Sequence, residues 1–76
     1  MKVSIYTTDH CPYCHLTMEF LKQNNIPFDE INVSHDRAKA EEMIAKSGQM
    51  GTPVTEIDGN IIIGFDKNAL KRALKL

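Results

Sequence analysis

The sequence is poor in three features that would each point to a particular class of protein: long apolar runs, net charge and cysteine. No apolar run approaches the roughly 20 residues of a membrane-spanning helix, so we expect no membrane span. The formal net charge of −1 argues against a general nucleic-acid-binding protein. Cys11 and Cys14 are the only cysteines, and a disulfide closing so short a loop would add little stability.

The chain also has no internal repeat, linker or low-complexity segment, so we expect a single domain over residues 1–76, acting as a monomer. The short apolar stretch at the start is followed almost at once by polar residues 7–10, which is unlike a signal peptide. We therefore expect a cytoplasmic protein. In the cytosol a close cysteine pair more often serves redox or metal chemistry than structural cross-linking.

Local patterns predict seven elements. Strands are expected at residues 2–7 and 28–33, and a hairpin at 54–57 and 60–63 around Asp58-Gly59, a favoured two-residue turn. A helix is expected from Pro12 to residues 24–25, with Thr17, Phe20 and Leu21 on its buried face. Two further helices are expected, one from a Ser34 or Asp36 cap to Gly48, with Glu41, Glu42 and Lys46 solvated, and one after Asp66 that buries Leu70, Ala73 and Leu74.

The resulting order, β-α-β-α-β-β-α, predicts an α/β fold. The βαβ half should pair its strands in parallel through a right-handed crossover, and the hairpin should add two antiparallel strands. We expect one mixed four-stranded sheet with helices packed on its faces.

The two cysteines, in Cys11-Pro12-Tyr13-Cys14, should not be equivalent. Cys11 lies at the predicted helix N-terminus, where free N–H groups and the helix dipole favour an anion, so the pKa of its thiol should be lowered. Cys14 lies one turn further in and should remain a buried thiol. We expect the Cys11 thiolate to attack a substrate disulfide, and Cys14 or an external thiol to resolve the mixed disulfide.

Residues beside the cysteines fit this chemistry. Pro12 should keep the active-site loop rigid, and Tyr13 is either an exposed aromatic that contacts substrate or an ordinary surface tyrosine. Thr52-Pro53, which enters a predicted strand after a glycine-containing loop, is a candidate cis peptide. A cis-Pro53 would turn the Thr52 backbone outward to pair with an extended peptide or a thiol ligand.

The cysteine pair also fits a metal site or a haem attachment site as an alternative. Cys11 to His15 also match the attachment motif of a c-type haem, but no export signal is seen. A zinc site would use Cys11 and Cys14 with His10 and His15, but zinc sites draw a second ligand pair from a distant segment. An iron–sulfur cluster shared across a dimer would need outside thiols. We therefore expect no bound metal or cofactor.

Three motifs carry a resemblance to glutaredoxins over essentially the whole chain: Cys11-Pro12-Tyr13-Cys14, Thr52-Pro53-Val54 and Gly64-Phe65-Asp66. The resemblance implies a thioredoxin-like fold and thiol–disulfide oxidoreductase activity on protein or glutathione mixed disulfides, with glutathione as a co-substrate. Cys11 would be the nucleophile. The substrate- or glutathione-binding residues would be Thr52, Pro53, Gly64, Phe65 and Asp66.

The chain departs from the usual glutaredoxin pattern at three positions. Thr8 stands where many members have a lysine, Ile63 replaces a glycine, and Lys67 replaces an acidic residue. Loss of a cation weakens capture of a glutathione carboxylate. These changes resemble glutaredoxin-like redoxins that take electrons from thioredoxin reductase, such as those serving ribonucleotide reductase. The expected electron donor is therefore glutathione or thioredoxin reductase, and the expected substrates are disulfide-containing proteins.

Overall fold

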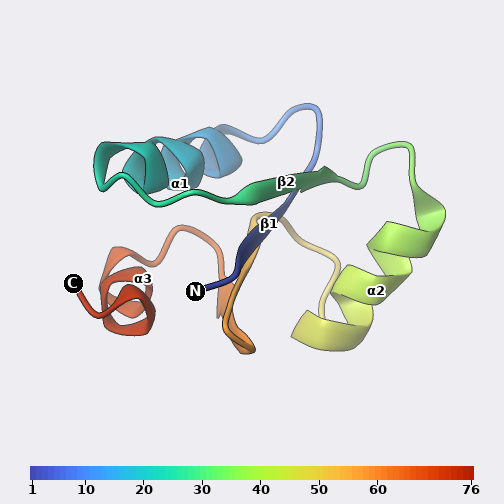
Figure 1. Ribbon diagram of the computed structural model, residues 1–76. Helices are drawn as coiled ribbons and strands as arrows, with labels where there is room; N and C mark the ends of the chain where they lie inside the picture. The colour runs from blue at the N-terminus through green and yellow to red at the C-terminus, as the bar shows by residue number, and fades with distance from the viewer.

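The computed structural model describes residues 1–76 and contains the seven predicted elements in the predicted order (Figure 1). They are β1 (Val3–Thr7), α1 (Pro12–Gln23), β2 (Asp29–Asn32), α2 (Arg37–Ser47), β3 (Val54–Ile57), β4 (Asn60–Ile63) and α3 (Lys67–Leu74). The four-stranded sheet has the order β2-β1-β3-β4, with β1 and β2 parallel and the other two pairs antiparallel. The mixed sheet and α/β architecture are as predicted.

Helices cover both faces of the sheet, which is why every residue of the central strand β1 is buried. Helices α1 and α3 lie on one face, and α2 lies on the other (Figure 1). The first face is packed by a cluster that includes Phe20, Leu21, Leu70 and Leu74. The second is packed by Tyr6 and Val54 from the sheet, together with Met43 of α2 and Val33.

Helix α1 begins where the sequence predicts, because Cys11 occupies the N-cap and Pro12 the first helical position. The expected inward stripe of Thr17, Phe20 and Leu21 is buried. The helix ends at Gln23, where the Asn24 side-chain amide donates to the Phe20 carbonyl. A short loop, residues 8–11, connects the end of β1 to the first turn of α1.

Strand β2 is shorter than predicted, because Phe28 and Val33 lie just outside it. It is an edge strand that pairs only with β1, over Asp29–Asn32. Both apolar anchors nevertheless pack against the core, Phe28 on the α1 and α3 face and Val33 on the α2 face. The sequence pattern that predicted a longer strand came from these two packed side chains, whereas the strand itself is mostly exposed.

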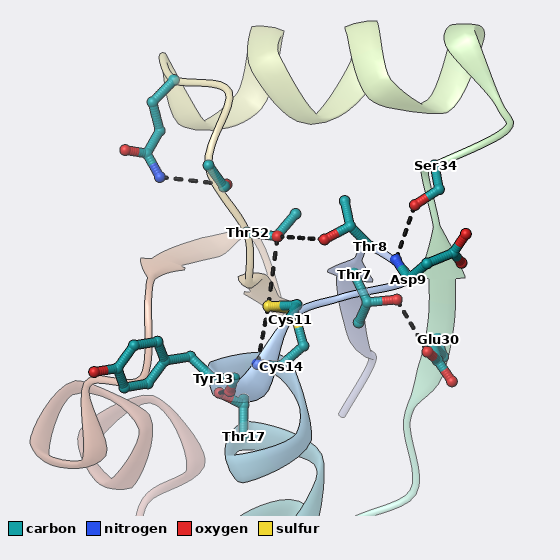
Figure 2. The surroundings of a disulfide bond; sticks show 12 residues. Thr7, Thr8, Asp9, Cys11, Tyr13, Cys14, Thr17, Glu30, Ser34 and Thr52 are labelled. Atoms are coloured by element: carbon teal, nitrogen blue, oxygen red, sulfur yellow. Dashed lines mark hydrogen bonds between the residues drawn. A yellow bond between two sulfur atoms is a disulfide. The ribbon is translucent and has the colours of Figure 1, made fainter.

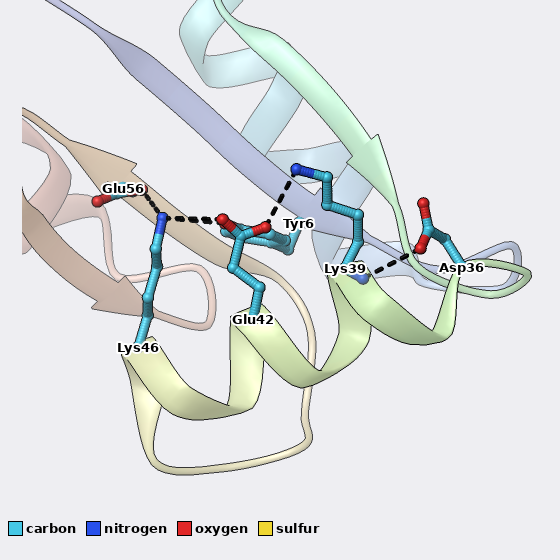
Figure 3. A network of polar contacts seen from close by, with 6 residues as sticks. All are labelled: Tyr6, Asp36, Lys39, Glu42, Lys46 and Glu56. Carbon is cyan, nitrogen blue, oxygen red and sulfur yellow. Dashed lines mark hydrogen bonds and ion pairs between the residues drawn. The ribbon is translucent and has the colours of Figure 1, made fainter.

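Helix α2 has the predicted caps, but its polar side chains are not simply solvated. Asp36 accepts a hydrogen bond from the Lys39 N–H, and Gly48 ends the helix at φ +75°. Lys46 donates to Glu56 of β3 at 2.8 Å and to the Tyr6 hydroxyl at 3.3 Å, and it also pairs with Glu42 (Figure 3). Glu42 and Lys46 remain solvent-accessible, as expected, but the sequence did not predict that the long Lys46 side chain reaches from α2 to β1 and β3.

The β3–β4 hairpin and α3 follow the sequence closely. Asp58 and Gly59 both have positive φ, +48° and +89°, as a type I′ turn requires. Asp66 caps α3 by accepting from the Ala69 N–H, while Leu70 and Leu74 are buried and Ala73 is partly buried. None of the three helices has the length and apolar character needed to span a bilayer.

Candidate active site

The site forms where the end of β1 meets the start of β3. Tyr6 lies opposite Val54 in this antiparallel pair, so the loop after β1 runs beside Thr52 and Pro53. The Thr52–Pro53 peptide is cis, as predicted from the sequence. Figure 2 shows the Cys11–Cys14 pair at the first turn of α1, with Thr52 and Thr8 on the far side of the Cys11 sulfur.

Cys11 and Cys14 form a disulfide with a Cα–Cα distance of 5.2 Å, within the usual range for such bonds. Cys11 is the N-cap residue, and its Sγ accepts a 3.1 Å hydrogen bond from the Cys14 N–H. The side chain of an N-cap residue normally satisfies the free N–H groups of the first turn. In reduced protein the same geometry would direct an N–H group and the positive end of the helix dipole at a Cys11 thiolate.

The two cysteines differ in burial. Cys14 is 1% exposed, whereas Cys11 is 7% exposed and borders an open depression of about 540 Å³. Pro12 and Tyr13 are exposed between them. An incoming disulfide can therefore reach Cys11 first, and Cys14 lies behind it.

Thr52 presents both backbone and side-chain groups to this site. No group of the chain hydrogen-bonds to its backbone N–H or C=O, so both remain available to an extended ligand. Its hydroxyl donates to Cys11 Sγ at 3.5 Å and lies 3.1 Å from the hydroxyl of Thr8.

Gly64, Phe65 and Asp66 take three different positions. The Gly64 N–H donates to the Pro53 carbonyl at 2.9 Å, which holds this loop against the cis-proline. The Phe65 ring packs edge-on against Phe20, with centroids 6.3 Å apart, and so contributes to the core. Asp66 uses Oδ1 to cap α3. The structure therefore brings Gly64 directly to the Pro53 backbone, whereas the Phe65 side chain packs against Phe20 in the core.

A polar cluster around Asp9 holds the loop that precedes Cys11. The Asp9 carboxylate accepts from the Asn32 side-chain amide at 2.9 Å and lies 3.1 Å from Nε2 of His35, while its backbone N–H donates to Ser34. These contacts, with the Asn32 amide as the largest influence, hold the pKa of Asp9 below its usual value. Sequence reasoning missed this cluster. The cluster depends on the parallel register that sets Thr7 opposite Asn32, and the sequence carries no local signal for that register.

The structure shows no cluster of donor side chains that matches the zinc alternative. No group of three or more His, Cys, Asp or Glu side chains is placed to hold a metal ion. His10 and His15 border the depression beside Cys11, but both are exposed surface residues.

Comparison with known proteins agrees with this geometry. Residues 3–62 match the glutaredoxin family. The chain belongs to the glutaredoxin family. A glutaredoxin-like 8.6 kDa protein from the rubredoxin operon of Clostridium pasteurianum is 45% identical over 73 residues, which cover 96% of this chain and 97% of that protein. Glutaredoxin 3 of Escherichia coli K12 is 41% identical over 64 residues, which cover 84% of this chain and 77% of that protein.

A solved structure extends the comparison to redoxins. NrdH-redoxin from Escherichia coli, described as a glutaredoxin-like protein with a thioredoxin-like activity profile, superimposes with a TM-score of 0.86 at 29% identity. The match covers 95% of this chain and 93% of that one. This glutaredoxin is thus a redox protein with a thioredoxin-like fold, and its Cys11–Cys14 pair lies at disulfide distance.

Proposed function

We propose that this glutaredoxin is a dithiol oxidoreductase that reduces disulfides of proteins and glutathione mixed disulfides. The observation that carries the proposal is the position of Cys11. Its sulfur caps the N-terminus of α1, it is the more accessible of the pair, and Cys14 lies behind it at a Cα–Cα distance of 5.2 Å. A thiolate at a helix N-terminus is stabilised, and a thiolate is the nucleophile of disulfide exchange.

The proposed reaction has two exchange steps. The Cys11 thiolate attacks one sulfur of the substrate disulfide, forms a mixed disulfide and releases the other sulfur as a thiolate. The Cys14 thiol then loses its proton and attacks the Cys11 sulfur, which frees the second substrate sulfur. Two electrons pass to the substrate, and the protein is left with the Cys11–Cys14 disulfide found in the structure.

Exposed apolar side chains close in sequence to the site residues support a protein substrate. Tyr13 is 62% exposed beside the cysteines, and Met50, two residues before Thr52, is 79% exposed. Ile63, next to Gly64, and Leu16 of α1 are also exposed. Exposed apolar side chains near a reactive site are typical of protein-interaction surfaces.

A second candidate concerns the electron donor, which we propose to be thioredoxin reductase in preference to glutathione. Ile63 favours thioredoxin reductase, because its exposed side chain stands where the family commonly has glycine and could crowd a bound glutathione. Ile63 directly precedes Gly64, which hydrogen-bonds to the Pro53 carbonyl. Thr8 also supplies no charge for a glutathione carboxylate. The thioredoxin-like activity profile named for the similar Escherichia coli NrdH-redoxin supports the same donor.

A paired reduction assay tests both proposals. Oxidised protein is given NADPH with glutathione reductase and glutathione in one arm, and NADPH with thioredoxin reductase in the other. A disulfide-bonded protein such as insulin is the final acceptor, and Cys11→Ser is the control. We expect fast turnover with thioredoxin reductase. Turnover only in the glutathione arm would overturn the proposed donor, and no turnover in either arm would overturn the proposed activity.

A further inference from the structure

Two threonine hydroxyls and the Cys11 sulfur form a continuous chain of hydrogen bonds. The Thr8 hydroxyl lies 3.1 Å from the Thr52 hydroxyl, which lies 3.5 Å from Cys11 Sγ (Figure 2). Thr8 comes from the loop after β1 and Thr52 from the loop before β3, and both are half-buried. The chain therefore joins the two loops that build the site and ends on the nucleophilic sulfur.

The number of protons on the two hydroxyls decides which group donates in each hydrogen bond. A threonine hydroxyl carries one proton and can accept further hydrogen bonds. If Thr52 donates its proton to Cys11, the contact between the two threonines can be made only with Thr8 as donor. A negative charge on Cys11 favours this arrangement, because both protons then point toward the charge.

We propose that Thr8 is a positioning residue, which orients the Thr52 hydroxyl toward Cys11 and so stabilises the Cys11 thiolate. Thr8 does not touch the sulfur and acts through Thr52. This role deepens the proposed function, since it concerns the same nucleophile, and it suits a chain that has no lysine at position 8. A chain of neutral donors takes over part of the stabilisation that a cation would otherwise give.

Other polar groups near Cys11 are engaged elsewhere or lack a contact with its sulfur. Asp9, His10 and His15 border the same depression. Asp9 is hydrogen-bonded to Asn32, and neither histidine hydrogen-bonds to Cys11 Sγ. The only hydrogen bonds to that sulfur come from the Cys14 N–H and the Thr52 hydroxyl. Of these two donors, only Thr52 has a side chain that a neighbour can orient.

The thiolate state should gain most from this chain. A disulfide sulfur is a weak acceptor, whereas a thiolate is a charged one, and charge-assisted hydrogen bonds are about twice as strong as neutral ones. Each further bond in a chain strengthens the next by about 10–30%. Thr8 should therefore lower the pKa of Cys11 and raise the reduction potential of the pair, by less than Thr52 does.

The test is a titration of the Cys11 thiol, followed by the absorbance of its thiolate at 240 nm. The Cys14→Ser background leaves Cys11 as the only thiol. In this background we compare Thr8→Val, Thr8→Ser, Thr52→Val and the Thr8→Val/Thr52→Val double variant. Ser34→Ala is the matched control, because it removes a hydroxyl that binds the same loop through the Asp9 N–H but lies outside the chain to the sulfur. The melting temperature of each variant shows that it is folded.

We expect Thr52→Val to raise the pKa of Cys11 by about one unit, since it removes a hydrogen bond to a charged group. Thr8→Val should raise the pKa by a few tenths of a unit, Thr8→Ser should restore it, and Ser34→Ala should leave it unchanged. In the Thr52→Val background, Thr8→Val should have no further effect, because the link between Thr8 and the sulfur is already cut.

Two results would overturn the proposal. One is an unchanged pKa in Thr8→Val, or in Thr8→Ala should the valine variant fail to fold. The other is an equal shift with and without Thr52, which would mean that Thr8 acts only through general loop structure. The titration needs no reductase or substrate, so its outcome is independent of the paired reduction assay.

Discussion

The backbone N–H of Gly64 donates a 2.9 Å hydrogen bond to the carbonyl oxygen of Pro53. This bond extends the β3–β4 pairing past Val54 and Ile63, the last facing residues of the hairpin. It fixes Ile63 beside the cis-proline segment, with its side chain 48% exposed. We therefore expect the side chain at position 63 to affect how closely a ligand can approach this backbone.

Replacing this side chain should improve the use of glutathione. We expect Ile63→Gly to lower the KM for glutathione in the glutathione-coupled assay, because removal of the branched side chain opens the backbone to close approach. A glycine inside a strand costs roughly 0.5–1 kcal/mol of folding stability, which the fold should tolerate. Ile63→Val keeps the branched side chain and serves as control. An unchanged KM in the glycine variant would show that Ile63 does not exclude glutathione.

Thr55 should be a site where a polar side chain destabilises the protein. It is fully buried in β3, and its hydroxyl has no hydrogen-bond partner. Thr55→Val keeps the shape and removes the unpaired group, so we expect the free energy of unfolding to rise by about 1 kcal/mol. Urea denaturation measures this as a higher midpoint at an unchanged m-value.

Thr17→Val is the matched control for that prediction. Thr17 is equally buried, but its hydroxyl donates to the Tyr13 carbonyl at 2.9 Å. The same substitution there should lower the free energy of unfolding by about 1 kcal/mol. Shifts of the same sign at both positions would contradict the role assigned to the Thr55 hydroxyl.

The Asp9 cluster should respond to acid. The Asn32 amide is the main cause of the lowered pKa of Asp9, and His35 contributes less. A carboxyl whose pKa is lower in the folded state stabilises the protein above its unfolded pKa, and the effect is lost as pH falls below about 4. Asn32→Ala should raise the pKa of Asp9 by more than His35→Ala does. An NMR titration of the Asp9 carboxyl checks this order, and the reverse order would refute it.

Local signals were enough to predict the helices, the strands and the position of the cysteine pair at the start of α1. Pro12 at the start of α1, Gly48 at the end of α2 and the Asp58-Gly59 turn each act over a few residues. The cis peptide and the buried Cys14 behind Cys11 were also anticipated, since both follow from placing the two motifs in this topology.

Contacts between distant segments could not be read from the sequence. The Lys46–Glu56 pair depends on where α2 lies over the sheet, and the Asp9–Asn32 contact depends on the β1–β2 register. The Thr8–Thr52 contact joins residues 44 positions apart, and no motif near either residue indicates that their hydroxyls meet. Such contacts are set by the packed fold, and they surround the site.

The most direct test of the account is to trap the intermediate on its nucleophile. Reduced Cys14→Ser protein is mixed with a disulfide-bonded protein, and the adduct is mapped by mass spectrometry, with Cys11→Ser as control. The account predicts a stable mixed disulfide on Cys11 in the first variant and none in the second. An adduct on Cys14 in the Cys11→Ser variant, or no adduct in either variant, would contradict the assignment of Cys11 as the attacking thiolate.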